Sequence, residues 1–565
     1  MKKVFLLLSS LVTGLGASLA IAPQNTLVIQ WASAITTTDP HHALDSNIQY
    51  SLTNVYETLV TYERNTSKLV PMLATSWKVG NNNKTFTFAL RKNVKFHSGS
   101  DFTCKDAEYS LRRLLISSSS LTYAFYLSLP LLGFDFWDDD LKKTTKFSSL
   151  TKAVHCDTGG NLVLETPQPS PLLLQRLTGT YAAILDSKFA IANGEWDGSQ
   201  TTWKDWIAKD LSNSAFNKPA SGTGAYQMVS RESEQLVFKA FSGYWGEKPK
   251  LENVIFKSVS EDASRVLAIK NGDADFVYLG NRASLAQVRG AAGVKVLVGK
   301  SPDSSAIMMN QDIAPKSKFI GSGKLDGKGI PTNFFSDIHV RRGLAASFDH
   351  NRMIKEIYSG NGERRIMAIP SLLPDYDPSI KIQGFDPELA KREFKQAFNG
   401  EVWNKGFSFL IPLDADRDMY SLLKQGLEKL NPKFKVLLKD LPQADLYAAL
   451  RQNVVPITIN GTNAEIPDGE ALARFFYSST GTFAPHTHYN DPQTEKAFAQ
   501  LATTADPAAR AKLMGLIGRR AAELLPIIPL PGTDRFWIYR QELKGFEANI
   551  NTFRYTYLLW NSISK

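Results

Sequence analysis

Cysteine is nearly absent from this chain, which has two, Cys104 and Cys156, among 565 residues. Neither falls in the spacing of a metal-binding or catalytic cysteine motif. The first lies far from the N-terminus, so no thiol is available there for a lipid anchor. In an exported protein an even number of cysteines permits one disulfide. We expect Cys104 and Cys156 to form it, and two separate buried thiols are the alternative.

Several catalytic signatures are missing as well. A nucleotide-binding Gly-x-x-x-x-Gly-Lys-Ser/Thr loop does not occur, because Gly327-Lys328 is followed by Gly329. No Gly-x-Ser-x-Gly nucleophile elbow occurs either. The Ser-x-x-Lys runs at 149–152 and 421–424 lack the companion Ser-Asp-Asn and Lys-Thr-Gly motifs of penicillin-recognising enzymes. These absences predict a protein that is not an enzyme.

Histidine offers little for metal binding. The chain has eight histidines, and the pair His486 and His488 has no third ligand at a recognisable spacing. A solvated loop is the simpler interpretation of that pair. His97 directly follows a predicted strand, where a structural hydrogen bond from its ring explains it better than catalysis. We therefore expect neither a bound metal nor a cofactor.

The composition is that of a large globular protein. Hydrophobic residues make up 43% of the chain and aromatic residues 11%, which excludes a disordered chain. The chain is too long for one hydrophobic core, since cores stop growing at about 250–300 residues, so two large lobes or three units are expected. The formal charge of +10 is modest and the basic residues are scattered among acidic ones. Nucleic acid is therefore not expected as a partner.

The N-terminus has the pattern of an export signal. Lysines precede an apolar stretch at 4–12, and a run of small residues ends in Ser18-Leu19-Ala20. We expect residues 1–20 to be a signal peptide that is cleaved, which leaves a soluble protein in the periplasm. An uncleaved membrane anchor is the alternative, because 4–22 approaches the length of a spanning helix, but serines, a threonine and glycines weaken its hydrophobicity.

Predicted strands and helices alternate along the chain, which indicates an α/β fold. In the first half, strands are predicted at 25–31, 84–90, 235–241, 253–258 and 274–279, and helices at 48–62, 106–115 and 262–271, the last ending at Gly272. A second block begins near residue 300. Its predicted helices are 338–347, 353–358, 387–398, 420–430 and 507–524, and its predicted strands are 407–411, 434–438 and the aromatic tail 536–560. Asp506 is expected to cap the helix that begins at Pro507.

A series of motifs runs through the chain in a fixed order. In the first half these are Leu73-Ala74-Thr75-Ser76-Trp77, 84–91, Val94-Lys95-Phe96-His97-Ser98-Gly99, Lys105-Asp106-Ala107, Gly222-Thr223-Gly224-Ala225-Tyr226, Tyr244-Trp245-Gly246 and Asn271-Gly272-Asp273-Ala274-Asp275. Later ones are 340–349, Tyr358-Ser359-Gly360, Phe385-Asp386-Pro387, 526–530 and Leu543-Lys544-Gly545-Phe546. In order and spacing they resemble the family 5 extracellular solute-binding proteins, the peptide- and nickel-binding receptors of ABC importers.

The resemblance implies a periplasmic-binding fold of type II, with two α/β lobes joined by two hinge crossovers and ligand enclosed between them. By this analogy residues 21–300 form the first part of lobe I, 301–529 form lobe II, and 530–565 return to lobe I. Closure of the lobes on the ligand would be the signal that the importer reads. The implied partners are a peptide or small solute and an ABC permease in the inner membrane, with the receptor itself a monomer.

The resemblance also implies ligand-binding residues. Peptide receptors of the family carry a Trp-x-Ala-Asp-Tyr-like segment whose Asp binds the α-ammonium of the peptide, and 462–466 stands in its place here. Glu465 would take the role of the Asp, beside Asn463 and Ala464, while Thr462 and Ile466 replace the two aromatic residues. The turn Gly222, Thr223 and Gly224 is also expected at the ligand site.

An oligopeptide is therefore the predicted ligand, and the altered segment leaves alternatives open. A nickel chelate, haem or a sugar-like solute would suit a receptor of the same class. A periplasmic hydrolase is an alternative of another class, and labelling by a fluorophosphonate probe would reveal it. A cytoplasmic transcription regulator with a solute-binding domain is opposed by the export signal and by the lack of a helix-turn-helix extension.

Overall fold

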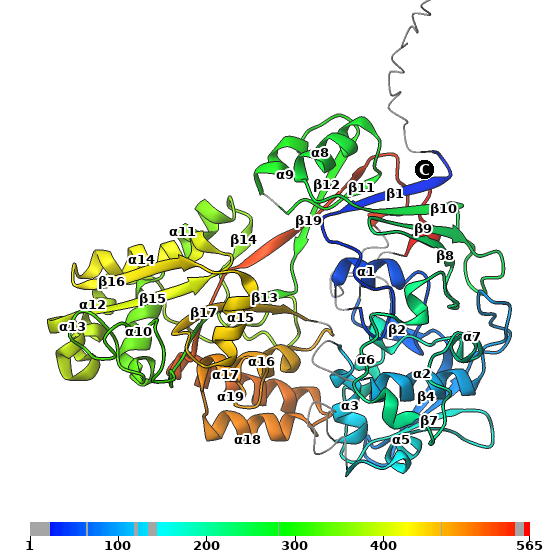
Figure 1. Ribbon diagram of the computed structural model, residues 1–565, viewed down its shortest axis with the longest axis horizontal. Helices are drawn as coiled ribbons and strands as arrows, with labels where there is room; N and C mark the ends of the chain where they lie inside the picture. The colour runs from blue at the N-terminus through cyan, green and yellow to red at the C-terminus, as the bar shows by residue number, and fades with distance from the viewer. Residues whose placement is uncertain are drawn as a thin grey trace, which may run out of the picture.

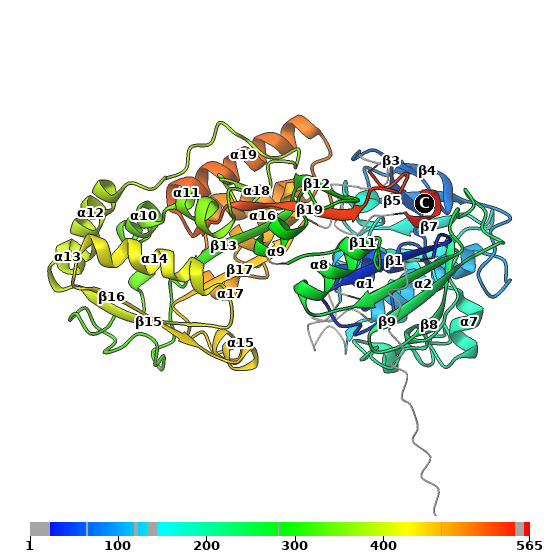
Figure 2. The same cartoon turned by 90° about the horizontal axis from the view of Figure 1, so that it is seen from above.

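Two lobes lie side by side and are connected by strands that pass between them (Figures 1 and 2). The computed structural model describes residues 23–43, 45–63, 66–117, 122–133, 144–280, 282–464, 466–547 and 559–565. None of the helices in these ranges combines the length and the apolar character that crossing a membrane requires.

Lobe I is built on a large mixed sheet with the strand order β12–β19–β11–β1–β10–β9–β8, in which β14 also pairs with β19. Its strands are β1 (Thr26–Trp31), β8 (Tyr226–Arg231), β9 (Gln235–Ala240), β10 (Asn253–Ser258), β11 (Phe276–Val277), β12 (Val294–Lys300), β14 (Gly362–Glu363) and β19 (Gly532–Arg540). Helices α8 (Asp262–Asn271) and α9 (Arg282–Val288) lie beside β11 and β12 (Figure 1).

The central strand β1 runs parallel to β10 on one side and to β11 on the other. All six of its residues are buried, as expected for a parallel strand covered on both faces. Because side chains alternate along a strand, Leu27, Ile29 and Trp31 join one hydrophobic cluster and Val28 joins another. The sheet therefore separates two packed layers.

A second, antiparallel sheet of lobe I has the order β4–β5–β7–β6, with bounds Ala74–Gly80, Thr85–Leu90, Leu162–Glu165 and Val154–Cys156. A two-stranded ribbon, β2 (Val60–Tyr62) and β3 (Leu69–Pro71), lies near it. The helices of this part are α1 (Ser46–Leu52), α2 (Cys104–Ile116), α3 (Phe125–Leu132), α5 (Phe147–Ala153), α6 (Leu173–Arg176) and α7 (Ser187–Ala192).

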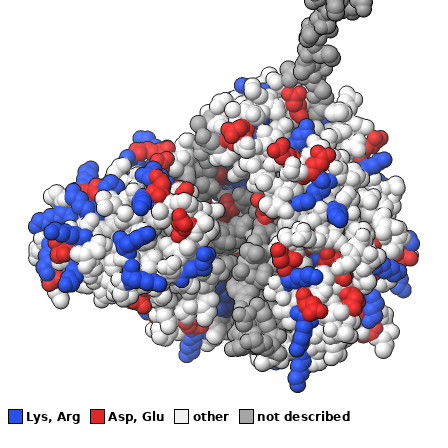
Figure 3. Space-filling model, viewed as in Figure 1, with Lys and Arg blue, Asp and Glu red and all other residues white. Residues whose placement is uncertain are grey.

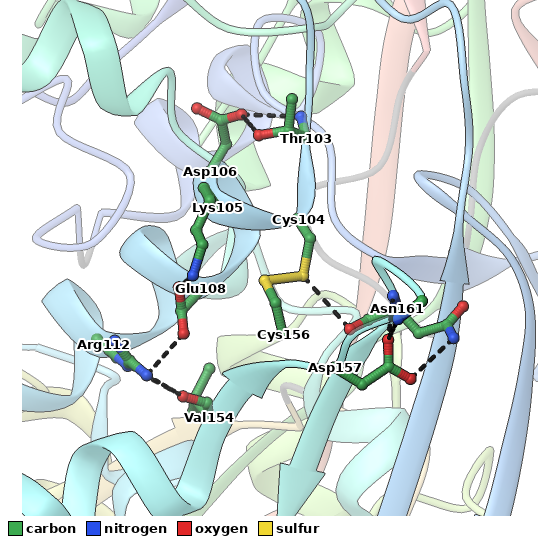
Figure 4. The surroundings of a disulfide bond; sticks show 11 residues. Thr103, Cys104, Lys105, Asp106, Glu108, Arg112, Val154, Cys156, Asp157 and Asn161 are labelled. Carbon is green, nitrogen blue, oxygen red and sulfur yellow. Dashed lines mark hydrogen bonds and ion pairs between the residues drawn. A yellow bond between two sulfur atoms is a disulfide. The ribbon is translucent and has the colours of Figure 1, made fainter.

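A disulfide ties this part of lobe I together (Figure 4). Cys104, the first residue of α2, is bonded to Cys156 at the end of β6, with 6.0 Å between the Cα atoms. The bond encloses a loop of 52 residues. In the chain-entropy model a loop of this length corresponds to about 4 kcal/mol of stabilisation.

Lobe II has two small sheets. Antiparallel strands β17 (Ile457–Asn463), β13 (Asp303–Met309) and β18 (Ile527–Pro529) form one, and parallel strands β15 (Phe407–Leu413) and β16 (Phe434–Asp440) form the other. Its helices are α10 (Ile338–Ser347), α11 (His350–Arg352), a π-turn at Met353–Ile357, α12 (Pro387–Gln396), α13 (Glu401–Lys405), α14 (Arg417–Leu430), α15 (Gln443–Arg451), α16 (Gly469–Tyr477), α17 (Ala484–Thr487), α18 (Pro492–Leu501) and α19 (Pro507–Leu524).

Strand pairing shows where the chain changes lobes. Strand β12 ends at Lys300 in the sheet of lobe I, and β13 begins at Asp303 in lobe II. Strand β18 ends at Pro529 in lobe II, and β19 begins at Gly532 in the sheet of lobe I. The two connections therefore lie side by side, as a hinge requires.

Several predicted elements agree with the structure where local signals define them. Asp506 caps α19 by accepting a hydrogen bond from the Ala509 N–H, at 2.8 Å, and Pro507 is the first residue of the helix. Gly272 ends α8 with φ +86°, in the left-handed region that favours glycine. These helix ends depend on a few neighbouring residues, which explains why the sequence alone was sufficient to predict them.

Other predictions were wrong in extent. The helix predicted at 48–62 stops at Leu52, because the backbone beyond it makes tertiary contacts. The Asn54 and Val55 carbonyls accept hydrogen bonds from the Tyr226 and Gly224 N–H groups, at 3.0 and 2.9 Å. The tail predicted as strand over 536–560 is strand only to Arg540, and 548–558 lie outside the described residues.

Candidate functional site

A cavity of about 610 Å³ lies at the hinge, between the lobes. Lobe I contributes Trp31 and Tyr278, lobe II contributes β13 and β17, and the second connection contributes Pro531, Gly532 and Thr533. We call this space the hinge cavity. Figure 3 shows the surface hollowed between the two lobes. The volume falls in the range of about 300–1,000 Å³ that is usual for small-molecule sites.

An aromatic wall closes the lobe I side of the hinge cavity. The rings of Trp31 and Tyr278 stack with 4.8 Å between centroids and 2° between planes. Trp31 ends β1, and Tyr278 follows β11 immediately. Since β1 and β11 are parallel neighbours, their carboxyl ends place the two rings side by side, at the edge where open α/β sheets bind ligands. This wall can stack a planar or apolar group.

Polar groups form the lobe II side. Asp303, Ser304 and Ser305 of β13 pair with Asn463, Thr462 and Gly461 of β17, and all six residues line the hinge cavity. The Ser304 side chain is 3% exposed, and its Oγ makes no hydrogen bond to a described residue. This wall therefore offers hydroxyl and amide groups to a ligand.

Two carboxylates line the hinge cavity. Its lining includes the carboxylates of Asp45 and Asp303, and no lysine or arginine occurs among the described lining residues. The nearby Arg535 has its Nη2 atom 3.7 Å from Asp303 Oδ1. Burial lowers the pKa of Arg535 to about 10, an effect that Asp303 opposes, so its guanidinium is charged at neutral pH. The carboxylate oxygens at the cavity wall can accept hydrogen bonds from a cationic ligand group.

A single side chain fastens both hinge connections. Buried Arg365 donates hydrogen bonds to the backbone carbonyls of Asp303 and of Ser301, the latter at 3.1 Å. Its guanidinium also lies against Gly532, where an added Cβ would be 2.2 Å from Arg365 Nε. A larger residue at 532 would force the Arg365 guanidinium out of this position.

The predicted segment 463–465 reaches the hinge cavity in part. Asn463 lines the cavity. Ala464 is 3% exposed, and its N–H donates to the Pro302 carbonyl at 3.2 Å, so this residue fastens the segment to the hinge. Glu465 lies outside the described residues.

The structure places the predicted turn Gly222, Thr223 and Gly224 elsewhere. This turn packs inside lobe I and does not line the hinge cavity. A Cβ added at Gly222 would be 2.1 Å from the Val55 carbonyl oxygen, so glycine is needed here for backbone approach. The turn has a structural role because its backbone pairs with residues 54 and 55.

Other sequence motifs meet this turn around a buried acid. Glu57 accepts hydrogen bonds from Tyr244 Oη, at 2.9 Å, and from Trp245 Nε1, at 2.8 Å. Burial raises the pKa of Glu57 to about 7, although the hydrogen bonds from Trp245 and Tyr244 lower it. The motifs most recognisable in the sequence therefore stabilise lobe I.

The histidines of interest are held in structural hydrogen bonds. His97 Nε2 donates to the Gly224 carbonyl at 2.9 Å, and His97 Nδ1 accepts from the Gly222 N–H at 3.2 Å. This confirms the structural role expected for His97. His486 Nδ1 is 2.9 Å from Asn460 Nδ2. Within the described ranges, no group of three or more His, Cys, Asp or Glu side chains is arranged to hold a metal ion.

Sequence reasoning missed Trp31, Tyr278, Asp45 and Asp303. The first two carried a detectable signal, because each stands at the carboxyl end of a predicted strand. Nothing near Asp45 or Asp303 in the sequence marks these residues, which come together only because the hinge connection lies beside lobe I.

Comparison with known proteins places the chain in a family. Residues 68–484 match the model of bacterial extracellular solute-binding proteins, family 5 middle. Heme-binding protein A of Haemophilus influenzae is 23% identical over 367 residues, which cover 62% of this chain and 58% of that protein. The dipeptide-binding protein of Escherichia coli is 25% identical over 370 residues, covering 63% and 59%. The matched region spans less than two thirds of the length of both relatives.

A solved structure shows the same fold. That of HbpA2 from Haemophilus parasuis has a TM-score of 0.74 at 19% identity, covering 95% of this chain and 99% of that one. The two-lobed α/β fold expected from the sequence is thereby confirmed.

Proposed function

The chain belongs to the bacterial extracellular solute-binding proteins of family 5, and on that premise we propose that it is the periplasmic substrate-binding protein of an ABC importer and that it captures peptides. An inner-membrane permease is its partner, and the receptor acts as a monomer. Family members are solute-binding proteins, so we assign it no enzymatic activity.

The hinge cavity is the observation that carries this proposal. It is lined from both lobes, so a ligand there contacts both and favours the closed form by its differential affinity. Its carboxylates Asp45 and Asp303 suit the α-ammonium of a peptide, and the stack of Trp31 on Tyr278 suits an apolar side chain.

The division of the chain is part of the proposal. Residues 1–20 are a cleaved signal peptide, and 21–300 with 530–565 form lobe I around 301–529 as lobe II. The strand pairing of β12, β13, β18 and β19 supports these boundaries. We propose that Glu465, two residues beyond Asn463 in the sequence, binds a cationic group of the ligand.

Calorimetry tests the proposal with a tripeptide panel, guided by native mass spectrometry of any ligand that co-purifies. We expect the unmodified peptide to bind and the N-acetylated peptide to bind about 10- to 100-fold more weakly, because a hydrogen bond to a charged group contributes about 1.5–3 kcal/mol. Asp303→Asn and Glu465→Gln should weaken only the unmodified peptide. Exposed Asp312, which does not line the cavity, gives the control Asp312→Asn.

Small-angle scattering provides the second readout, since a saturating ligand should compact the protein. Equal binding of both peptide forms, or identical scattering profiles with and without ligand, would contradict the proposal. A sugar-like solute is the second candidate, because stacked aromatic rings and hydroxyl groups also suit a sugar. Binding of a trisaccharide but of no peptide would establish it.

A further inference from the structure

The two connections between the lobes are short. Strands β12 and β13 are joined by residues 301 and 302, and strands β18 and β19 are joined by residues 530 and 531. The second residue of each connection is a proline, Pro302 in one and Pro531 in the other, and the proline ring fixes φ. Rotation of one lobe against the other therefore depends on a small number of backbone angles.

Lobe II holds three consecutive carbonyls at the first connection. Arg365 donates hydrogen bonds to the carbonyls of Ser301, at 3.1 Å, and of Asp303. The Pro302 carbonyl between them accepts a hydrogen bond from the Ala464 N–H at 3.2 Å. Because the peptide group is planar, the ψ angle of a residue sets the direction of its carbonyl. These hydrogen bonds therefore restrain three consecutive ψ angles, on either side of a φ angle that the proline already fixes.

The guanidinium of Arg365 also reaches the second connection. It lies against Gly532, where an added Cβ would be 2.2 Å from Arg365 Nε and 2.3 Å from Arg365 Nη2. Strand β14, which ends two residues before Arg365, pairs with β19 by placing Gly362 opposite Thr533 and Glu363 opposite Gly532. Figure 1 shows β14 beside β19, where β19 passes from one lobe to the other. This segment of lobe II therefore contacts both connections at once.

An exposed ionic contact joins the same strands. Lys300 Nζ, at the end of β12, lies 3.2 Å from Glu363 Oε2 and 3.5 Å from Asp534 Oδ1 of β19. Glu363 also accepts a hydrogen bond from Ser371 Oγ at 2.6 Å. The Lys300 side chain is half exposed, whereas Arg365 is 1% exposed. Since exposed ion pairs contribute little, Arg365 is the main restraint on the hinge.

The lobes meet on the side of the cleft that lies away from the hinge. The centroids of the Phe125 ring, in α3, and the Phe475 ring, in α16, are 6.3 Å apart across the boundary between the lobes. Ala471 of α16 packs against the hydrophobic core of lobe I. The backbone angles that Arg365 restrains are therefore those of a closed arrangement.

We propose that Arg365 is a positioning residue for ligand capture, which keeps part of the ligand-free protein in the closed arrangement. Arg365 is not among the described residues that line the hinge cavity, but Asp303 and Gly532, which it holds, both line it. It therefore acts on a ligand through the backbone of these two residues. A larger closed population in the free protein raises the affinity for any ligand that both lobes contact. This inference goes beyond the proposed function and is independent of the identity of the ligand.

Double electron–electron resonance tests the proposal by measuring the distance between the lobes in the ligand-free protein. Spin labels are placed at Ser148→Cys on α5 and Lys496→Cys on α18, two exposed positions in different lobes, and labelling without reductant leaves the native disulfide intact. Arg365→Met keeps the side-chain length and removes two hydrogen bonds from a charged donor. It should lower the ratio of closed to open protein about 10- to 100-fold.

A second variant leaves the arginine in place. In Gly532→Ala the added Cβ forces the Arg365 guanidinium away from its position, so the lobes should separate as they do in Arg365→Met. Because both changes break the same contact, the double variant should open little further than either single variant. Arg365→Lys, which keeps the charge but has a single donor group, should give an intermediate distribution.

Arg341→Met is the matched control. Arg341 is also buried and also donates to backbone carbonyls, those of Phe335 at 2.7 Å and Ser336 at 2.8 Å, but all of these residues lie in lobe II. Its replacement should lower the stability of the protein and leave the distance between the lobes unchanged. Circular dichroism and thermal unfolding check that each variant is folded, and Gly532→Ala decides alone if Arg365→Met does not fold.

Identical distance distributions in the wild type, Arg365→Met and Gly532→Ala would overturn the proposal. An equal shift in Arg341→Met would also overturn it, because a general loss of stability would then explain the opening.

Calorimetry with trialanine connects the hinge to ligand binding. The Kd of Arg365→Met should exceed that of the wild type by the factor by which the closed fraction falls. An unchanged Kd in a variant whose closed fraction has fallen would overturn the role of Arg365 in ligand capture. Failure of trialanine to bind either protein would count against the proposed function, whereas the distance measurement would still decide whether Arg365 holds the hinge.

Discussion

Each lobe buries an arginine between two carboxylates, and the two clusters differ in how they titrate. In lobe I, Arg113 binds Asp39 at 2.6 Å and Glu195 at 2.7 Å. In lobe II, Arg510 binds Asp468 at 2.8 Å and Glu470 at 3.0 Å. The ionic composition is the same, so any difference arises from the surroundings.

The aspartates respond in opposite directions. Burial would raise the pKa of Asp39, but Arg113 and His41 outweigh it, and the pKa lies below its usual value. Burial and the neighbouring carboxylate of Asp375 raise the pKa of Asp468 to about 6, although Arg510 opposes them. At Asp39 the charge of Arg113 is the first influence that opposes burial, whereas at Asp468 the charge of Asp375 adds to the effect of burial.

The two clusters lie in different parts of the molecule, so the opposite pKa shifts of Asp39 and Asp468 affect different regions. Arg113 fastens α2 to the loops that hold Asp39 and Glu195, inside lobe I. Asp468 caps α16, whose Arg474 and Phe475 line a cavity to which both lobes contribute. A buried proton is therefore gained or lost near pH 6 in lobe II, while Asp39 in lobe I stays ionised at that pH.

The largest expected effect is the loss of the lobe I arginine. Arg113→Met leaves two buried carboxylates without their cation and should lower the free energy of unfolding by about 3–5 kcal/mol. Arg510→Met should cost less, about 1–3 kcal/mol, because Glu470 keeps Arg474 and Asp468 can take up a proton. Urea unfolding followed by circular dichroism measures both.

If Arg113→Met and Arg510→Met lowered the free energy of unfolding equally, the expected difference between the two clusters would be contradicted. A matched control is Arg352→Met, which removes an exposed ion pair with Glu356 at 2.8 Å. Its effect should stay within about 0.5 kcal/mol.

The disulfide is a further difference between the lobes, because both of its cysteines lie in lobe I. Replacing Cys104 and Cys156 by serine should lower the stability of that lobe by about 2–4 kcal/mol. Thiol labelling of the denatured, unreduced wild type checks the bond directly. No label should be incorporated, and two labelled thiols per chain would contradict the pairing.

The proton on Asp468 should make the stability of lobe II depend on pH. The folded-state pKa, about 6, exceeds the unfolded value, so this contribution is complete below about pH 4 and is lost as pH rises through 6. The loss amounts to about 2–3 kcal/mol. Asp468→Asn, which can still cap α16, should remove it.

Trp403 provides a local probe for this measurement, because it is the only tryptophan within residues 301–529. Urea unfolding at pH 4, 5, 6 and 7, with Trp403→Phe to identify its signal, gives the difference between wild type and Asp468→Asn. Asp39→Asn should differ from the wild type by a constant amount over this range, since the lowered pKa of Asp39 contributes stability that is lost only as pH falls below about 4. A constant difference between wild type and Asp468→Asn across this range would show that Asp468 is not the titrating group.

The smallest effect concerns an exposed helix cap in lobe II. Asp506→Ala removes the acceptor for the Ala509 N–H at the start of α19 and should cost about 1 kcal/mol. Asp506→Asn, which can also cap, should cost only a few tenths. If Asp506→Ala lowered the free energy of unfolding as much as Arg510→Met does, burial would not explain why the arginine clusters contribute more stability than an exposed helix cap.

The sequence predicted those parts of the fold whose causes are local. The helix at 507–524 was predicted from its cap and its proline. The end of the helix at 262–271 was predicted from Gly272, which follows it. The ordered motifs around Glu57, Gly222 and Tyr244 identified the family, and the structure shows that they pack together to stabilise lobe I.

The candidate site could be predicted only in part. Asn463 was found by resemblance, whereas Asp45 and Asp303 had no local signal. The predicted helix ends early because the carbonyls of residues 54 and 55 accept hydrogen bonds from Tyr226 and Gly224, far along the chain. Similarly, the raised pKa of Asp468 depends on Asp375, which is distant in sequence.

Caps, prolines and alternating apolar residues act over a few positions, so the sequence by itself determined most helices and strands, the two-lobed α/β class and the family. The tertiary structure brings together neighbours from distant segments and buries them. These neighbours determine which residues line a cavity, which glycines are needed for close packing, and which carboxylate has a raised pKa. Only the tertiary structure decided these, because the free energies of desolvation and charge interaction depend on distances in space.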